Sequence, residues 1–243
     1  MNPVYIIDSI RTPRARANQK GGLNKLNPYE LLNVLYKDIE QKNFLNLNSI
    51  DEVILGCVTQ HGEQAGNIAK SSAMFSGYPD SISGLTVNRF CSSSLDAINL
   101  GHLKIQSKQA NNIIAGGVEM MSRVPMLSDQ AAIWTDVALA AQAKIFLMGS
   151  GADLIASLFN ISREDTDLQA LKSQQRAADA QTKNYFKSII PVINEYKSIN
   201  CVEDECIRRE TTIESLTSLS PSFQKLGEQG VDQAQLNLFP SLE

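Results

Sequence analysis

The sequence predicts an α/β fold built around a mostly parallel sheet. Short apolar segments alternate with stretches of helical periodicity about 10–15 residues long, which is typical of parallel βαβ units. Each predicted strand is nearly continuously apolar, as expected when helices cover both faces of a sheet. The chain has 243 residues, of which 43% are hydrophobic. It is therefore long enough to bury the core of one large domain or two smaller ones.

The predicted elements of this α/β region follow in order from the first residues of the chain. Residues 4–10 are apolar and β-branched and predict a strand. A helix is predicted at 28–42, because Pro28 stands at a favourable first position after Asn27 and apolar residues recur at helical spacing. Further strands are predicted near 51–58, 84–88 and 111–119, with helices at 67–75 and 94–108 between them.

The rest of the chain predicts helices and loops. Helical segments are expected over 126–142 and 151–160, and a further helix should begin after Ser162, which has Asp165 three residues later as in a capping box. The charged stretch 203–210 is predicted to be solvated, and few structural signals follow Pro221. We therefore predict a first domain at 1–119 and a second domain at 120–243 that adds no strand to the central sheet.

Composition excludes several classes of function. The net charge of −4 argues against a general nucleic-acid-binding protein, which would carry a basic surplus. No apolar run reaches the roughly 18 residues needed to span a bilayer. The N-terminal residues become charged after a short apolar run, so a cytoplasmic location without a membrane partner is expected. An anionic ligand would be held by local basic groups or helix N-termini.

Three of the four cysteines have simple interpretations. Without an export signal they are expected to be free thiols. Cys201 and Cys206 have no second pair at zinc-ligand spacing, so no metal site is expected. Cys57 stands in the apolar run VILGCV and is expected to be a small buried hydrophobic residue.

Cys91 is the candidate nucleophile. A strand is predicted to end near Asn88, and a helix to begin at or just after Cys91. A helix N-terminus stabilises a thiolate, and the carboxyl edge of an open α/β sheet is where ligands bind. On this local pattern alone, an active nucleophile and a buried, inert cysteine are about equally supported. We expect Cys91 to be the most reactive of the four thiols, at the start of a buried helix.

Longer sequence blocks resemble the thiolase family. VNRFCSSSLDA around Cys91 resembles the thiolase acyl-enzyme signature. The other matching blocks occur in the family's order from Val4 to Phe223 and are IRTPRAR, GCVTQHGEQAGNIAK, AGGVEMMSRVPM, MGSGADLIASLFNISRED and DECIRRETTIESLTSLSPSF. The resemblance implies an incomplete thiolase αβα lobe at 1–119. It also implies a largely helical loop domain at 120–243 that covers coenzyme A and supports oligomers.

The same resemblance implies an acyltransferase. Cys91 would take an acyl group from an acyl-CoA as an acyl-thioester intermediate and pass it to a second thioester or to CoA. The Cys91 N–H would contribute to an oxyanion hole. Met148 matches a methionine that lines the acyl pocket, and Arg208 matches an arginine near the CoA nucleotide. The alternative for Arg208 is a solvated surface arginine beside Arg209. No cofactor is implied beyond the CoA thioesters themselves.

The sequence departs from the family pattern in its catalytic acid and base groups. The family's second lobe supplies a Gly-His-Pro histidine and a Cys-x-Gly cysteine, and this sequence contains neither motif. His61 and His102 stand in no matching motif. We therefore expect an N-terminal lobe plus loop domain, unable to complete a thiolase cycle alone. The full-length family implies a homo-oligomer, or else a partner chain carrying the missing lobe.

The resemblance leaves two thiolase activities open, that of an acetyl-CoA acetyltransferase and that of a 3-ketoacyl-CoA thiolase. Two positions favour a broad-range or degradative 3-ketoacyl-CoA thiolase of fatty acid metabolism. Leu147 and Met126 stand where biosynthetic thiolases often carry histidines. Two alternatives remain beside this interpretation. One is a condensing enzyme of the ketoacyl-synthase type, against which the Met-Ser-Arg-Val-Pro and Ser-Arg-Glu-Asp blocks argue. The other is a non-catalytic CoA-binding or scaffolding protein.

Overall fold

The computed structural model describes residues 3–42, 46–240 and 242 and divides the chain into two compact units. The first unit comprises Met1–Asp129 and Lys187–Cys206, and the second comprises Gln130–Phe186 and Ile207–Glu243. The predicted domains at 1–119 and 120–243 stay a prediction. The compact units differ from that division mainly because residues 187–206 pack with the first unit.

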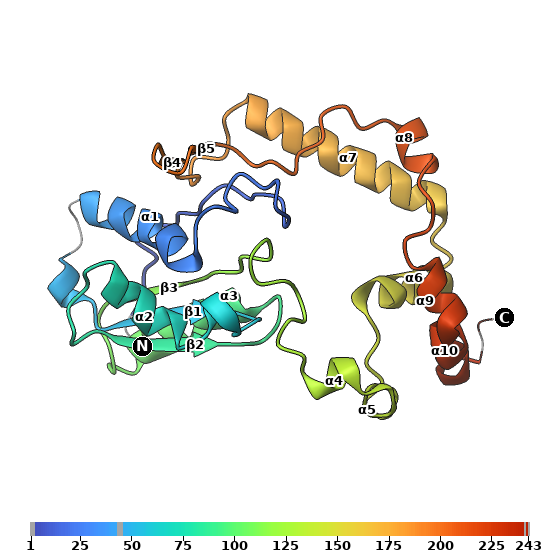
Figure 1. Cartoon of the computed structure of the whole chain (residues 1–243), viewed down its shortest axis with the longest axis horizontal. Coiled ribbons are helices and arrows are strands. Elements are labelled where there is room, and N and C mark those ends of the chain that lie inside the picture. Colours follow the sequence, from blue (N-terminus) through green and yellow to red (C-terminus); the bar gives the residue numbers. More distant parts are fainter. Residues whose placement is uncertain (1–2, 43–45, 241, 243) are drawn as a thin grey trace. The chain divides into compact units, whose positions relative to one another are not determined.

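A parallel sheet forms the centre of the first unit (Figure 1). Its strands are β1 (Glu52–Gly56), β2 (Ser83–Val87) and β3 (Ile113–Gly117), in the order β2-β1-β3. Gly56 is in register with Val87 on one side and Gly117 on the other, so the three strands end at one edge. The predicted α/β fold and these three strands are confirmed.

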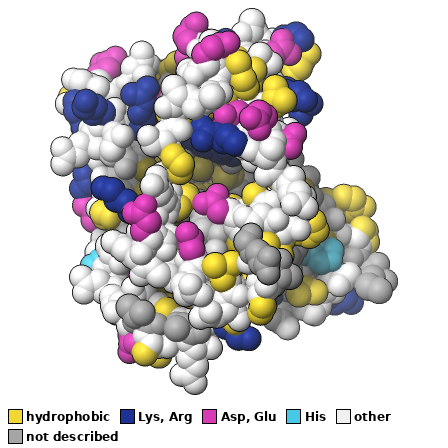
Figure 2. All heavy atoms as spheres, turned by 90° about the vertical axis from the view of Figure 1, so that its right-hand side faces the viewer, with side chains coloured by type: hydrophobic (Ala, Val, Ile, Leu, Met, Phe, Trp, Pro, Cys, Tyr) yellow, Lys and Arg dark blue, Asp and Glu magenta, His cyan; other side chains and the backbone are white. Residues whose placement is uncertain are grey.

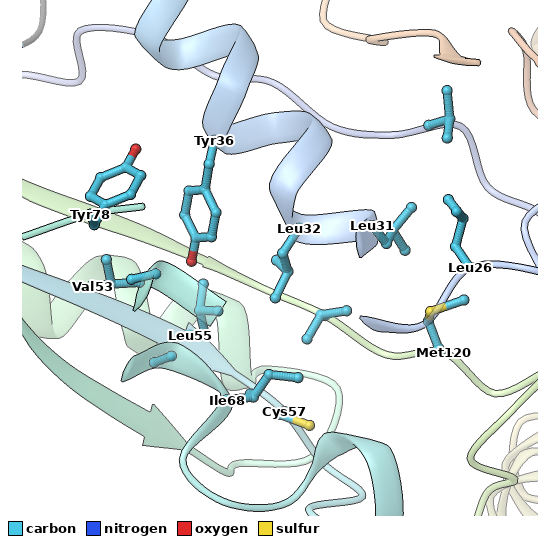
Figure 3. Close-up of a cluster of buried hydrophobic side chains, with 14 of the residues drawn as sticks. Leu26, Leu31, Leu32, Tyr36, Val53, Leu55, Cys57, Ile68, Tyr78 and Met120 are labelled. Carbon is cyan, nitrogen blue, oxygen red and sulfur yellow. The ribbon is translucent and has the colours of Figure 1, made fainter. Parts of the chain in front are cut away.

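Helices α1 (Pro28–Gln41) and α2 (Ile68–Phe75) cover one face of this sheet. Asn27 caps α1 with Pro28 at its first position, as predicted. Figure 3 shows Tyr36 and Leu32 of α1 pointing toward the strand that carries Val53 and Leu55, all members of one buried cluster. Side chains alternate along a strand, so Ile54 points to the opposite face, where α3 packs.

Helix α3 (Ser93–Gln106) buries small residues and exposes large ones. Its buried residues are Ser93, Ala97 and Gly101, and a side chain added at Gly101 would lie 3.3 Å from Ile113 Cγ2. Large apolar side chains on its outer side are exposed, among them Leu95, Ile98 and Leu103. The prediction of a buried helix after Cys91 is therefore wrong for the outer face. The small residues let the helix approach the sheet closely and leave the larger ones outside.

Residues 4–10 do not form the predicted strand. Tyr5, Ile6 and Ile7 are 72%, 79% and 73% exposed. A strand needs a partner for its backbone N–H and C=O groups. Among the described residues, this stretch pairs with no strand of the sheet, and only Arg11 beyond it makes a single bridge, to Ile189. Apolar, β-branched composition gives these residues a preference for the strand conformation, but composition does not determine whether another strand lies beside them to pair with.

The segment 187–206 carries a hairpin that the sequence did not predict. Strands β4 (Val192–Asn194) and β5 (Ile199–Cys201) are antiparallel and each has only three residues. Beyond the hairpin, Arg11 donates two hydrogen bonds to Asp204, at 2.7 and 2.8 Å. Glu205 accepts the N–H groups of Arg16 and Gly22 at 2.9 and 2.8 Å. The prediction that 203–210 is solvated is therefore wrong for these two carboxylates.

The second unit is helical. Its helices are α4 (Ala132–Thr135), α5 (Val137–Gln142), α6 (Met148–Leu158), α7 (Arg163–Thr182), α8 (Ile213–Thr217), α9 (Gln224–Leu226) and α10 (Asp232–Leu238). The Ser162–Asp165 capping box at the start of α7 is confirmed. The prediction of a helix over 126–142 is wrong for 126–131, which are not helical. The remainder is divided at Asp136, whose carboxylate accepts the N–H groups of Ala138 and Leu139. Within the described ranges, this unit adds no strand to the central sheet, as predicted.

Three-residue turns of 3₁₀ helix occur at Leu47–Ser49 and Gly62–Gln64, and a π-helical turn at Gly227–Val231 connects α9 and α10. In the part of the chain that the structure describes, no helix has the length and apolar character to cross a membrane.

The Arg11–Asp204 pair predicts a pH-dependent contribution to stability. We expect Asp204→Asn to lower the free energy of unfolding by about 1–3 kcal/mol at neutral pH. Arg11 holds the pKa of Asp204 below its ordinary value. The contribution is therefore fully present above the unfolded pKa of about 3.9 and is lost as the pH falls through the lower folded value. Urea unfolding at several pH values measures it.

The control is Asp80→Asn, which neutralises an exposed carboxylate of the same unit and should change stability by less than about 0.5 kcal/mol. The difference between wild type and Asp204→Asn should shrink in acid. A difference that stays constant down to low pH would contradict the assignment of this stability to the ion pair.

Candidate active site

Cys91 lies in the turn between β2 and α3, directly before the N-cap residue Ser92. Cys91 is exposed, so it is not buried, and its reactivity stays a prediction. The predicted strand–helix junction is confirmed at the carboxyl edge of the sheet. The Ser92 side chain makes no capping hydrogen bond, whereas the side chains of Asn27 and Ser162 cap α1 and α7. The first-turn N–H groups of α3 are therefore not occupied by their own cap side chain.

The turn before Cys91 is fixed through Phe90, whose φ of 48° lies in the left-handed region. A non-glycine residue there costs conformational energy and persists when its neighbours hold it. Asn88 Oδ1 accepts the Phe90 N–H at 2.8 Å, and Ser93 Oγ donates to the Phe90 carbonyl at 2.6 Å. Ser93 Oγ also accepts the Arg89 N–H at 2.9 Å. Both sides of the residue that precedes Cys91 are thus hydrogen-bonded.

Two glycines let the start of α3 rest on the ends of the strands. A Cβ atom at Gly56 would overlap the backbone of Ser93 and Ser94. A Cβ atom at Gly117 would overlap Ser94 Oγ and the carbonyl oxygen of Gly56. The absence of side chains at the ends of β1 and β3 therefore sets how closely the helix that follows Cys91 can approach the sheet.

A buried glutamine and a carboxylate join the loops at the same edge of the sheet. Gln64 is 0% exposed, and its Nε2 donates to Glu119 Oε1 at 2.8 Å and to the Thr59 carbonyl at 2.9 Å. Gln64 Oε1 accepts the Met120 N–H at 2.6 Å. Glu119 also accepts the N–H of Val58 at 2.8 Å. Sequence analysis did not single out this cluster, although both side chains stand in family-like blocks.

Two of the remaining thiols are suppressed by their surroundings. Burial raises the pKa of Cys57 to about 12, and the nearby Glu119 carboxylate adds to the effect. Burial likewise raises the pKa of Cys201 to about 11, with contributions from Glu205 and Asp204. Both thiols stay protonated at neutral pH. The prediction that Cys57 is a small buried residue is confirmed, while Cys206 is exposed.

Met148 and Arg208 both belong to the second unit. Met148 is the first residue of α6 and is 80% exposed. Arg208 is exposed and donates its backbone N–H to Gln174 Oε1 at 2.7 Å. The neighbouring Arg209 guanidinium instead donates to side chains of α7, namely Gln181 and Thr182. The roles predicted for Met148 and Arg208 stay predictions.

No set of metal ligands is evident among the side chains that the structure describes. Nowhere in residues 3–42, 46–240 and 242 do three His, Cys, Asp or Glu side chains gather closely enough to hold an ion. The chemistry supported by this edge of the sheet is that of a thiol and of oriented N–H groups.

Fold and junction together define an α/β protein with an exposed cysteine at the carboxyl edge of a parallel sheet. The family model "Thiolase, N-terminal domain" matches residues 4–232. The chain therefore belongs to the thiolase family, through the family's N-terminal domain.

Curated relatives are longer than this chain. The 3-oxoadipyl-CoA/3-oxo-5,6-dehydrosuberyl-CoA thiolase of Escherichia coli (strain K12) is 36% identical, over 93% of this chain and 61% of its own length. The 3-ketoacyl-CoA thiolase of Colwellia psychrerythraea is 38% identical, over 92% of this chain and 58% of its own length. A crystal structure of the Bacillus anthracis acetyl-CoA acetyltransferase matches 90% of this chain and 58% of that protein, with a TM-score of 0.77 and 28% identity.

The thiol environments predict a labelling order. At neutral pH, limiting iodoacetamide should modify Cys91 first, because it is exposed at a helix N-terminus. Cys57 and Cys201 should remain unmodified, since their raised pKa values keep them protonated. Peptide mass mapping over time gives the order. The exposed Cys206 is the internal control, and labelling of Cys206 with Cys91 silent would contradict the prediction.

The close approach at Gly56 predicts a steric effect of adding one methyl group. Gly56→Ala should lower the free energy of unfolding by about 1–3 kcal/mol, because the methyl overlaps the backbone at the start of α3. Gly116→Ala is the matched control, since its added methyl would meet only Leu55 Cδ2 at 3.9 Å. Urea unfolding of both variants measures the contrast. Equal effects of the two changes would argue against the close contact.

Proposed function

We propose that the protein carries out the acyl-accepting step of a thiolase reaction with Cys91 as the nucleophile. The observation that carries the proposal is the exposed Cys91 thiol at the start of α3, within the VNRFCSSSLDA block of a chain that belongs to the thiolase family. The sheet edge, the fixed turn and the absence of a side-chain cap on α3 support a nucleophile at this point.

The proposed step is an exchange of one thioester for another. The Cys91 thiolate attacks the carbonyl carbon of an acyl-CoA, and the resulting tetrahedral intermediate expels CoA as a thiolate. The acyl group is left as a thioester on Cys91 Sγ. The thiolate of a second CoA molecule can then attack the thioester on Cys91. This releases the Cys91 thiolate and carries the acyl group away as a new acyl-CoA. Negative charge develops on the carbonyl oxygen, and the Cys91 N–H is proposed to stabilise it.

In the degradative direction the proposed substrate is a 3-oxoacyl-CoA. Cys91 Sγ then attacks the 3-oxo carbonyl carbon, the C2–C3 bond breaks, and acetyl-CoA leaves as an enolate that must take up a proton from a group outside the Cys91 turn. The shortened acyl group stays on Cys91 as a thioester until a CoA thiolate removes it. The names of the relatives, which include 3-oxoadipyl-CoA and 3-ketoacyl-CoA thiolases, support this class of substrate. Met148 is proposed to line the acyl pocket and Arg208 to bind near the CoA nucleotide. The exposure of both residues leaves them accessible to a ligand. A cytoplasmic role in fatty acid metabolism belongs to the same proposal.

The complete reaction is proposed to need groups beyond those at the Cys91 turn. His61 and His102 are both exposed, and neither stands in a motif of the family. We propose that the full cycle runs in an oligomer or with a partner chain that supplies the remaining acid and base groups. Exposed apolar side chains support an assembled state. Figure 2 shows hydrophobic side chains among charged ones on the viewed surface, and Leu95, Ile98 and Leu103 of α3 are exposed.

The decisive test is whether an acyl group is transferred to Cys91. Incubation of the 243-residue chain with acetyl-CoA should transfer one acetyl group to the protein with release of CoA, seen by intact mass and mapped to Cys91. Cys91→Ala should abolish the adduct, and Cys206→Ala should retain it. The complete thiolysis of acetoacetyl-CoA by the chain alone should be slow. It should be slower by several orders of magnitude than in a mixture with a polypeptide that corresponds to the part of a relative that this chain does not match.

Each contrary result has a distinct meaning. CoA binding by equilibrium dialysis without any acyl-cysteine would favour the non-catalytic CoA-binding alternative. Rapid turnover by the single chain would overturn the need for further groups and would direct attention to His61 and His102.

A further inference from the structure

We propose that Asn88 is a positioning residue for Cys91, and that Glu119 fixes the peptide against which Asn88 is anchored. This inference rests on the proposed role of Cys91 as nucleophile. It assigns to the carboxyl edge of the sheet a chain of hydrogen bonds that runs from β3, through the loop after β1, to the turn that carries the thiol.

The Asn88 amide connects two parts of the backbone. Its Oδ1 accepts the Phe90 N–H at 2.8 Å and closes the turn directly before Cys91. Its Nδ2 donates to the Val58 carbonyl at 3.1 Å, in the loop that follows β1. A side chain that only closed the local turn would need no more than the hydrogen bond to the Phe90 N–H. The second bond ties the Cys91 turn to the neighbouring strand.

Glu119 holds the two peptide groups on either side of Val58, including the Val58–Thr59 peptide whose carbonyl accepts from Asn88. The Val58 N–H, which belongs to the first of them, donates to Glu119 Oε2 at 2.8 Å, and the Thr59 N–H donates to Glu119 Oε1 at 3.3 Å. Gln64, which is buried, donates to the same Oε1 at 2.8 Å and so fixes the carboxylate. The Val58 carbonyl, which accepts from Asn88, is therefore connected through Thr59 and Glu119 to the buried amide of Gln64.

Such a connection matters because Phe90 is in the left-handed region. If the turn relaxed toward an ordinary backbone conformation, the direction of the Cys91 N–H and thiol would change. Misplacement of a reacting group by about 1 Å can cost about 100-fold in rate. The thiol would remain exposed, however, so its reaction with a small reagent should change much less than its reaction with a bulky thioester.

The experiment compares four variants of the whole chain. Asn88→Ala removes both hydrogen bonds of the amide. Asn88→Ser retains an oxygen that can accept the Phe90 N–H, as in an ST-turn, but is too short to reach Val58. Glu119→Ala removes the remote anchor. Asn112→Ala is the matched control, because the Asn112 amide also donates to a loop carbonyl at 3.1 Å, that of Ser49 at the other edge of the sheet.

Three measurements are made on each variant: the rate of acetylation of Cys91 by acetyl-CoA, the rate of its alkylation by iodoacetamide, and amide hydrogen exchange in the peptide around Phe90. We expect Asn88→Ala to slow acylation by about 10- to 100-fold while alkylation changes less than about 3-fold. Exchange should accelerate. Asn88→Ser should restore slow exchange without restoring acylation, and Glu119→Ala should also slow acylation. The Asn112→Ala control should keep all three rates.

The results separate failure of this inference from failure of the proposed function. If the wild type is acylated and Asn88→Ala is acylated at the same rate, the positioning role is overturned and the proposed function stands. Slow acylation in Asn88→Ala but not in Glu119→Ala would overturn the anchor. If the wild type is not acylated, the proposed acyl transfer to Cys91 is wrong. Hydrogen exchange around Phe90 then tests whether Asn88 and Glu119 hold the turn. Unchanged exchange near Phe90 in both Asn88→Ala and Glu119→Ala would overturn the positioning role.

Discussion

The close contact between the start of α3 and the ends of β1 and β3 determines the rest of the candidate site. Gly56 and Gly117 have no side chains that could keep the helix away, and Ser93 and Ser94 fill the space that they leave. Because Gly56 is in register with both Val87 and Gly117, the three strands end at the level where the helix begins. The β2–α3 turn therefore has to reverse direction within a few residues. This constraint places Phe90 in the left-handed region and presents Cys91 at the edge of the sheet.

The same contact explains the unusual distribution of side chains on α3. A helix that lies this close to a sheet can bury only small residues on its inner face, here Ser93, Ala97 and Gly101. Its larger apolar residues then face outward. Hydrophobic periodicity alone would have placed the large residues inside. The expectation of a buried helix was wrong for this reason: the helix packs on the sheet through its small side chains, and its larger apolar side chains stay exposed.

Local patterns in the sequence predicted those elements whose stability depends on neighbours close in the chain. The caps of α1 and α7, the three parallel strands and the junction at Cys91 depend on short-range signals and were predicted correctly. Long-range partners were not predictable in this way. Residues 4–10 have strand composition without a strand beside them, and Asp204 is paired with Arg11, 193 residues away. The Gln64–Glu119 hydrogen bond joins residues 55 positions apart, and no local pattern indicates it.

The electrostatics of the site follow from these contacts. The chain carries a net charge of −4, so it cannot stabilise a thiolate or a CoA thioester through an overall positive field. At the sheet edge Glu119 adds negative charge: burial is the main cause of the raised pKa of Cys57, and the Glu119 carboxylate contributes to it. Glu119, however, is surrounded by donors from Val58, Thr59 and Gln64, which satisfy its oxygens locally. Oriented N–H groups thus hold the carboxylate at the strand ends. Glu119 is therefore a structural anion at this edge of the sheet, held by backbone and amide donors from the loop and turn that follow β1.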